Sequence, residues 1–578
     1  IHSYIGDYLY QLIFLFTMKR LFLFVSLTLA ACAPLLAQTP NVALSKAFDE
    51  PDNGANRLLL LQNGSTLYFH FTPDNGIRVA VYDDKHQQRA QTTLAGKTWD
   101  DRDMKRSELK GIYEINGQAV IFLQQIDHKT PYLFRIVVDP KTGRVAKEDQ
   151  IGELPKYNFW DGYALAWGSV KEHDFYVEKD PESDYYAVVQ FNSFASSSDE
   201  RIQVVHYSPE HKEINRAFYE LPDKQFKYLD YQAIYVHKDD YVFIAAYGYN
   251  SGKAKDAKLI ISKLAKGSKS FQHETLAYTE GFRQPQSGIQ YDAPHQTIRL
   301  LTITNAKNLD LDKSIKYHNR EYVMMMSYID PAQLKVTHHN YIEDTYVTEY
   351  AQSKLHFKHD YVGMPQDYVL NPDGTSTIML EELKQISHTN SSSGVGGSFS
   401  SSTYWTTEFN DIGIAKINAL GQEVSGYAIA KSQETYGYFS YWHNYQRDRG
   451  AWSFRRNGLM GNHNLAPFFS YQYLHPLNTD YVIFNDYNKN IRDQSESYRD
   501  KKEMHYASET STVCYRRSQD GTMDKFFLYG DPGDQDINRY TILESTIHTP
   551  DQKKMVTIMV EKDGRREAQA HIAWIDFE

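Results

Sequence analysis

The sequence predicts an all-β fold, and two of its features support that prediction. The first is a period-two alternation of apolar and polar residues, clear in "STLYFHF", "DYVFIAAY" and "KMVTIMV", which is typical of strands with one buried face. The second is a strand–turn–strand unit that recurs along the chain. Helical patterns are scarce. We expect helices only at residues 100–111 and 492–504, both charged enough to lie on the surface.

The recurring unit joins an apolar strand to a more polar one through a turn rich in Asp, Pro, Gly and Lys. Seven copies read "VAVYDDKHQQRA", "RIVVDPKTGRVA", "VVHYSPEHKEIN", "IISKLAKGSKSF", "MMSYIDPAQLKV", "IAKINALGQEVS" and "VCYRRSQDGTMD". An eighth, "HIAWIDFE", has only the first strand. A second tight turn precedes each copy and joins another strand pair. These turns, which supply positive φ or a preset proline φ, are Asn63-Gly64, Asn116-Gly117, "DPESD", "VHKDD", "DAPHQ", "NPDG", "LNTD" and "TPDQ".

Eight units of four strands, A to D, predict a β-propeller, in which sheets that are marginal alone are buried by packing around an axis. The last unit lacks strand D. The isolated segment "NVALSKAF", residues 41–48, is expected to supply that strand and close the ring. Seven blades with one miscounted unit, or two smaller β domains, are the alternatives. Residues 38–578 are thus treated as one propeller domain.

Loop lengths distinguish the two faces of the predicted ring. The A–B and C–D turns share one face and are nearly all short, whereas the B–C and D–A connections share the other and are long. Long loops on a rigid scaffold usually carry function, so we expect binding on this long-loop face. The longest connections are residues 192–200, 305–321, 387–405, 430–466 and 484–509. Within 387–405, "GVGGSFSSS" opens no helix and reads as a flexible loop rather than a phosphate-binding loop.

Aromatic and arginine side chains are concentrated in the D–A connection 430–466, and two further Trp residues fall in other loops of the same face. Flat rings beside forked donors suit sugar rings, peptides or acidic groups. The alternative is that these rings only pack a long loop onto the ring of blades. The candidate ligand-binding residues are Trp160, Trp405, Tyr438, Tyr441, Trp442, His443, Arg447, Arg449 and Trp452.

The segment "FNDYNKNIRD" is a weaker candidate for a calcium site. Asp486, Asn488 and Asn490 present alternating side-chain oxygens, as calcium loops do. The segment lacks the Gly at the sixth position and the Glu at the twelfth position of such a loop, and an Asx-rich turn explains it equally well. Apart from this calcium ion, we expect no cofactor.

An enzyme is the main functional alternative. Propeller hydrolases and lyases use carboxylates, His or Tyr gathered near the axis. The chain has no HExxH, GxSxG or paired CxxC motif. The groups that could reach the axis are Asp161, Asp411, Glu434, His443, Asp448 and Asp486.

Residues 1–37 precede the predicted domain and read as translated upstream sequence followed by an export signal. After Met18 come two positive charges, an apolar run and small residues, the usual layout of such a signal. "LAAC" resembles a lipobox, which would make Cys32 a lipidated first residue and the protein an outer-membrane lipoprotein. The apolar residues after Cys32 instead favour cleavage before Gln38. The segment before Met18 could also extend the apolar run into a membrane anchor.

Composition limits the partners and the environment. The net charge of −11 disfavours nucleic acid. With only Cys32 and Cys514, no disulfide framework supports the fold, and Cys514 reads as a small buried hydrophobe. The 45 Tyr residues suit strands and wet contact surfaces. We expect an exported protein, periplasmic or extracellular, which would touch a membrane only through a lipid on Cys32.

The leader ending "LLAQ", the high Tyr content and the segments "DIGIAKINALGQEVSGYAIAKSQ" and "YVIFNDYNKN" resemble uncharacterised secreted proteins of Bacteroidetes-type bacteria. This resemblance implies a cell-envelope or extracellular role and names no catalytic residue. The leading hypothesis is a non-enzymatic propeller that binds a glycan or an envelope or extracellular protein through its long-loop face. A polysaccharide-active hydrolase or lyase, and an envelope scaffold, are the alternatives.

Overall fold

The computed structural model describes most of the chain after the predicted leader. The predicted leader and several candidate ligand residues, among them Trp160, lie outside the described residues. The described residues are 40–51, 54–102, 104–158, 172–251, 255–305, 322–393, 399–437, 439, 452–453, 467–492, 497, 501–533, 537–564 and 566–577.

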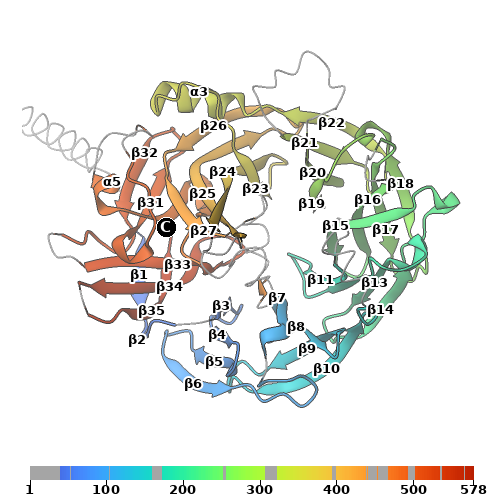
Figure 1. Ribbon diagram of the computed structural model, residues 1–578, viewed down its shortest axis with the longest axis horizontal. Coiled ribbons are helices and arrows are strands. Elements are labelled where there is room, and N and C mark those ends of the chain that lie inside the picture. The colour runs from blue at the N-terminus through green and yellow to red at the C-terminus, as the bar shows by residue number, and fades with distance from the viewer. Residues whose placement is uncertain are drawn as a thin grey trace, which may run out of the picture.

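The described residues form eight antiparallel sheets that follow one another around a central axis (Figure 1). This arrangement confirms the predicted eight-bladed propeller, and every predicted A–B and C–D turn joins the strands expected of it. Blade 1 consists of β3 (Ala55–Leu60), β4 (Thr66–Thr72), β5 (Gly76–Tyr82) and β6 (Gln88–Thr93), and blade 2 of β7 (Ser107–Ile115), β8 (Gln118–Asp127), β9 (Thr130–Val138) and β10 (Val145–Glu153). Blade 3 consists of β11 (Asp174–Lys179), β12 (Tyr186–Phe191), β13 (Ile202–Tyr207) and β14 (Glu213–Phe218), and blade 4 of β15 (Tyr228–His237), β16 (Tyr241–Tyr249), β17 (Lys258–Ala265) and β18 (Gln272–Leu276).

The second half of the ring repeats this pattern, with additions. Blade 5 consists of β19 (Gln286–Asp292), β20 (Thr297–Asn305), β21 (Tyr322–Ile329) and β22 (Val336–Ile342), and blade 6 of β23 (Met364–Leu370), β24 (Ser376–Ser393), β25 (Phe399–Ile417) and β26 (Glu423–Ile429). Blade 7 consists of β29 (Gln472–Leu474), β30 (Asp480–Asp486), β31 (Ser511–Arg517) and β32 (Met523–Phe527), and blade 8 contains β33 (Ile537–His548), β34 (Lys554–Asp563) and β35 (Gln569–Asp576). Short strands β1 (Asn41–Leu44), β2 (Phe48–Asp49), β27 (Gln433–Tyr436) and β28 (Trp452–Ser453) add to the edges of blades, and the α-helices are α3 (Thr345–Lys354) and α5 (Asn488–Arg492).

The N-terminal strand closes the ring, as the sequence predicted. β1 pairs antiparallel with β35 and is the fourth strand of blade 8, with Asn41 opposite Asp576 and Leu44 opposite Ala573. The adjoining seam between blades 8 and 1 is held by Trp574, which is 1% exposed and donates its indole N–H to the Thr66 hydroxyl at 2.9 Å. Chain ends far apart in sequence therefore share one sheet.

Apolar contacts between neighbouring blades form the core. Each adjacent pair of blades shares a buried cluster, such as the one between blades 1 and 2 or the one between blades 5 and 6. Cys514 lies fully buried in the cluster between blades 7 and 8, which confirms its predicted role as a small hydrophobe. No helix among the described residues is both long enough and apolar enough to cross a membrane.

The two predicted helices were wrong wherever the structure describes them. Residues 107–115 form β7, the inner strand of blade 2, and only Met104–Arg106 form a short 3-10 turn. The charges that suggested a surface helix are paired: Lys110 bonds Glu108 and Asp174. The described part of 492–504 has no helix after Arg492. The sequence reading also missed α3, which buries Val347 and Ala351 one turn apart.

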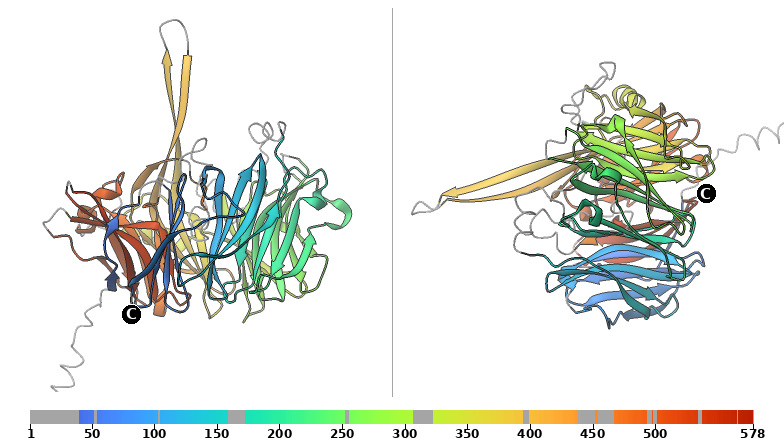
Figure 2. Two further views of the ribbon diagram at one scale, coloured as in Figure 1. Left: turned by 90° about the horizontal axis from the view of Figure 1, so that it is seen from below. Right: turned by 90° about the vertical axis from the view of Figure 1, so that its right-hand side faces the viewer.

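The predicted loop 387–405 is instead a β-hairpin. β24 and β25 stay paired from Ser376 opposite Ile417 out to Ser393 opposite Phe399, so only 394–398 of the expected flexible loop remain outside the described residues. The hairpin projects far from one face of the ring (Figure 2). We call residues 383–393 and 399–409 the arm. It joins blade 6 at a β-bulge, where Glu382 faces two residues of β25.

Candidate functional site

The arm stands on the long-loop face, and neighbouring loops support its base. β27, from the D–A connection after blade 6, pairs with the arm side of β25, placing Tyr436 opposite Thr406. The Gly437 backbone N–H donates to the Trp405 carbonyl at 2.8 Å. Backbone hydrogen bonds also join β27 to Met504 in the B–C connection of blade 7. Two connections thus support the base of the arm.

Aromatic rings line one face of this assembly. Side chains of directly opposed residues share a face of a sheet, so His388, Tyr404 and Tyr436 lie together; we call them the aromatic ladder. The His388 and Tyr404 rings stack with centroids 4.7 Å apart, and Tyr404 lies 6.1 Å from Tyr436. Tyr404 is 40% exposed and Tyr436 61% exposed. The ladder therefore offers apolar ring surface to solvent.

Polar groups surround the ladder at short range. His388 Nε2 and the Thr406 hydroxyl are 2.9 Å apart, which orients the imidazole ring. Lys384 donates to Glu408 at 3.0 Å on the same face, nearer the ring of blades. Trp405, the one described candidate ligand residue with a described side chain, points to the opposite face of the arm and is 37% exposed. The arm thus carries stacking surface on both faces.

Charged pairs lie near the axis on the innermost strand of several blades. They stand at the long-loop face, where each of these strands begins. Burial acts to lower the pKa of Lys110, but the carboxylates of Asp174 and Glu108 outweigh it and raise that pKa above its ordinary value. Arg57 of blade 1 bonds Glu544 of blade 8 at 2.9 Å. These pairs tie neighbouring blades together at the axis.

The D–A connection 430–466 reaches across to the axis. Its strand β28 pairs with β7, with Trp452 opposite Leu109, as an extra inner strand of blade 2. A segment that leaves blade 6 and enters blade 7 therefore visits the opposite side of the ring. The predicted ligand residues between β27 and β28 lie outside the described residues: Tyr438, Tyr441, Trp442, His443, Arg447 and Arg449.

Asp411 and Asp486, two of the described carboxylates proposed for an enzyme, both act on the buried Lys431 and favour its charged form. Asp411 accepts the Lys431 backbone N–H at 2.8 Å beside the bulge. Glu434 lies on β27 opposite Glu408. Asp486 is 2% exposed, and burial raises its pKa to about 6. Asp161, His443 and Asp448 lie outside the described residues.

The calcium candidates take part in a hydrogen-bonded turn at the start of α5. Asp486 accepts from the Tyr487 backbone N–H at 2.8 Å and from the Asn490 amide at 2.7 Å. Asn488 donates instead to Asn538 of blade 8 at 3.0 Å. Among the described residues, no group of three or more His, Cys, Asp or Glu side chains is placed to hold a metal ion. Calcium binding at Asp486, Asn488 and Asn490 stays a prediction.

A buried polar network beneath the arm was missed by the sequence reading. Lys431 and Glu381 form an ion pair at 2.7 Å and are 1% and 0% exposed. Ser470 donates to the second oxygen of Glu381 at 2.7 Å, and Gln433 accepts from Lys431 at 3.1 Å. The sequence signal was a single Lys in the apolar run "YAIAKSQ". This network joins β24, the start of the D–A connection and the entry to blade 7.

The carboxyl of Asp411 makes stability depend on pH. Burial and the neighbouring Glu382 carboxylate raise its pKa. The folded state therefore binds this proton more tightly than the unfolded chain, so ionisation lowers the free energy of unfolding as pH rises above about 4. Asp411→Asn keeps the acceptor for Lys431 but cannot ionise. We expect Asp411→Asn to gain stability relative to wild type between pH 5 and pH 8. The gain in free energy of unfolding should be about 1.4 kcal/mol for each pH unit in this range over which the wild-type carboxyl is protonated in the folded state and ionised in the unfolded chain. Urea unfolding at both pH values measures this, and an equal difference at both would contradict it.

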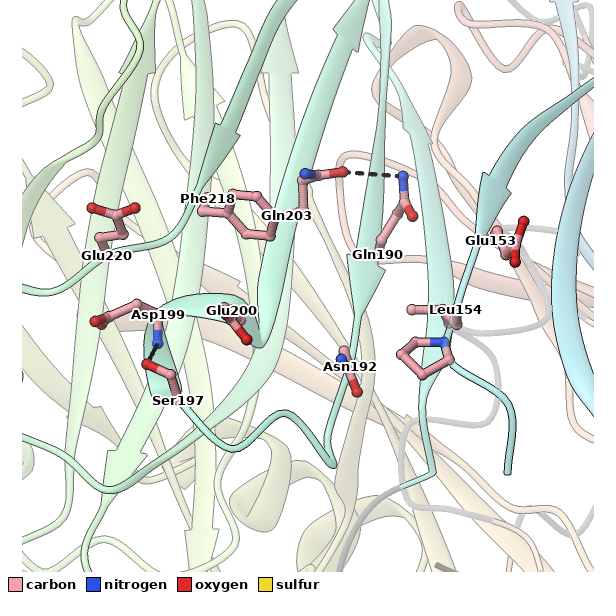
Figure 3. A pocket seen from close by; sticks show the side chains of 11 residues that line it. Glu153, Leu154, Gln190, Asn192, Ser197, Asp199, Glu200, Gln203, Phe218 and Glu220 are labelled. Carbon is pink, nitrogen blue, oxygen red and sulfur yellow. Dashed lines mark hydrogen bonds between the residues drawn. The ribbon is translucent and has the colours of Figure 1, made fainter. Parts of the chain in front are cut away.

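An acidic hollow lies between the outer parts of blades 2 and 3 on the same face (Figure 3). Its volume is about 580 Å³, and the predicted long loop 192–200 forms one wall. Asp199 already pairs with Lys224 at 3.6 Å. The hollow suits cationic groups better than acidic ones, because four carboxylates line it. Its lining residues are Glu153, Leu154, Pro155, Gln190, Asn192, Ser197, Asp199, Glu200, Gln203, Phe218 and Glu220.

No protein-family model and no curated protein matches the chain. Among solved structures, it is similar to the WD40 domain of SCAP from fission yeast, with 9% identity and a TM-score of 0.33 over 93% of this chain and 98% of that one. It is similar to prolyl oligopeptidase B from Galerina marginata, with 8% identity and a TM-score of 0.34 over 91% of this chain and 56% of that one. It is also similar to a protein of unknown function from Bacteroides caccae, with 8% identity and a TM-score of 0.24 over 68% of this chain and 94% of that one. The propeller assignment rests on the strand order of the eight sheets.

Proposed function

We propose that this protein is an exported, non-enzymatic binding module that holds a glycan or an extended protein segment on its long-loop face. The observation that carries the proposal is the aromatic ladder, where Tyr404 of the arm and Tyr436 of the adjoining strand β27 are both exposed. Aromatic rings with polar tips are favoured at wet contact surfaces because they bury large area with few rotatable bonds. The hydroxyls of Thr389 and Thr403 lie on the opposite face of the arm, the face that also carries Trp405.

The described carboxylates bear on the choice between binding and hydrolysis. A glycosidase needs two carboxylates facing each other across one bond. Asp411 and Asp486 accept hydrogen bonds from nearby backbone N–H groups, whereas Glu434 lies opposite Glu408 where β27 pairs with β25. A hydrolase or lyase with its site at the axis is therefore the second candidate.

The position of the N-terminus bears on the proposed location. Asn41 pairs with Asp576 at the end of β35, which lies on the short-turn face, opposite the arm. A lipid on Cys32 would therefore hold the short-turn face toward the membrane and present the arm away from it. With cleavage before Gln38, the protein would be free in the periplasm or outside the cell.

Binding is tested by titration of oligosaccharides and extended peptides, with product analysis of each hit. We expect Tyr436→Ala to weaken binding about tenfold, a typical loss for a central aromatic contact. Tyr346→Ala is the matched control, because Tyr346 is 45% exposed on α3, away from the arm. Intact ligand with loss only in the arm variant supports the proposal. New reducing ends or unsaturated products would establish the enzyme, and equal loss in both variants would exclude the ladder as the binding surface.

A further inference from the structure

The arm lacks the features that normally keep strand edges apart. Residues 385–407 contain no Lys, Arg, Asp, Glu or Pro, although the chain carries a net charge of −11. Natural proteins usually protect long edge strands with charges, Pro, bulges or covering segments. In the arm the bulge lies at the base, beside Glu382, and the pairing beyond Leu383 has no further register shift.

Among the described strands, none pairs with the outer edge of β24 beyond the bulge. β23 covers β24 only as far as Glu381. Beyond the bulge, residues 383–393 pair with β25 on one side, and no strand of the described chain pairs with their other side. The matching edge of β25 is partly covered, since β27 pairs with residues 406–409. The longer open edge therefore belongs to β24.

We propose that the open edge of β24 pairs antiparallel with the β24 edge of a second copy of this chain, so that two arms form one four-stranded sheet. A two-stranded ribbon is marginally stable in water, whereas a wider sheet satisfies the outward-facing backbone groups. Two identical strands related by a two-fold axis give a self-complementary contact, the commonest form of protein association.

Charge favours a second copy as the occupant of this edge. Two acidic bodies repel each other, but paired arms would meet mainly through residues 385–393, which carry no charged side chain. Eleven residues of strand, 383–393, extend about 36 Å at about 3.3 Å per residue. In an antiparallel pair the two bodies lie at opposite ends of the joined arms (Figure 2), several times the screening length of about 8 Å at physiological salt. The arm thus permits contact without close approach of the charged bodies.

The pairing has a consequence for ligand binding. A two-fold axis perpendicular to a sheet keeps the same face of both hairpins on the same side. Both aromatic ladders would then face one direction on a continuous surface. A ligand with repeated units could engage both, which raises its effective affinity without a new contact. The pairing itself does not depend on the nature of the ligand.

Sedimentation equilibrium of the purified protein over a range of concentrations tests the proposal. Thr389 and Thr403 are directly opposed on the arm, both exposed, with hydroxyls 3.4 Å apart. Thr389→Lys places like charges next to each other across the proposed interface, and Thr403→Lys places the same charge one strand farther away. We expect wild type to dimerise, Thr389→Lys to raise the dimer dissociation constant at least about tenfold, and Thr403→Lys to change it less than about threefold.

Repeating the measurement at high salt distinguishes charge repulsion between the arms from misfolding of the variant. High salt should restore part of the Thr389→Lys dimer, because screening weakens contacts between exposed charges, and both variants should melt like wild type. A wild-type protein that stays monomeric at 100 µM, or a Thr403→Lys variant as impaired as Thr389→Lys, would overturn the assignment of the β24 edge. Monomers that still bind ligand through the ladder would leave the proposed function standing while removing this interface.

Discussion

Removal of residues 38–44 is expected to open the ring and cost about 4 kcal/mol of unfolding free energy. β1 supplies the outer strand of blade 8 over four residue pairs, from Asn41 to Leu44. Backbone hydrogen bonds contribute about 1 kcal/mol each, and the deletion also uncovers β35. Folded domains have only about 5–15 kcal/mol in total, so the loss is large. Urea unfolding of the truncated and full chains measures it.

Addition of the missing strand in trans provides the control. A peptide of residues 38–44 should raise the melting temperature of the truncated protein, because a ligand that binds only the folded state stabilises it. A scrambled peptide of the same composition should have no effect. If truncation leaves stability unchanged, β1 does not close the ring.

Lys431→Met is expected to destabilise the protein by about 3–5 kcal/mol, since it leaves the Glu381 carboxylate buried without its cation. Glu381 is fully buried, and its other oxygen keeps only the hydrogen bond from Ser470. The change keeps an unbranched side chain but also removes the hydrogen bond of Lys431 to the Phe409 carbonyl at 2.7 Å. Urea unfolding at pH 7 measures the loss.

A double-mutant cycle separates the charge from packing. Glu381→Gln removes the stranded charge, so Lys431→Met combined with Glu381→Gln should cost less than the sum of the two single changes. Because the pair lies below the bulge, the double variant should also keep ligand binding on the arm. Additive losses would show that the ion pair does not carry the stability of this network.

Most of the propeller could be predicted because its signals are local. Turn residues such as Asn63-Gly64 set each hairpin, and the incomplete last unit with an unassigned strand at residues 41–48 pointed to closure. β7 was misread as a helix because Lys110 and Glu108, which pair at the axis, interrupt its alternation. Ion pairs between blades depend on tertiary neighbours, which local pattern does not reveal.

The arm and the aromatic ladder could not be predicted from local sequence patterns. The Ser-rich stretch reads as a loop because its strands have little apolar alternation, and their partner is each other. Trp405 was assigned to the correct face, but Tyr404 and Tyr436 come together only through the pairing of β25 with β27. The ion pair between Lys431 and Glu381 could not be predicted either, because the two residues are 50 positions apart in the sequence.

The most direct test of the binding account is the affinity of a ligand for a protein with a shortened arm. Ile386 and Thr406 are directly opposed, so an Asn-Gly turn can join them and replace residues 387–405 with a two-residue hairpin turn. This change removes His388, Tyr404 and Trp405 but keeps the bulge and β27. The account predicts an unchanged melting temperature and loss of ligand binding. Full affinity in the shortened protein would contradict it.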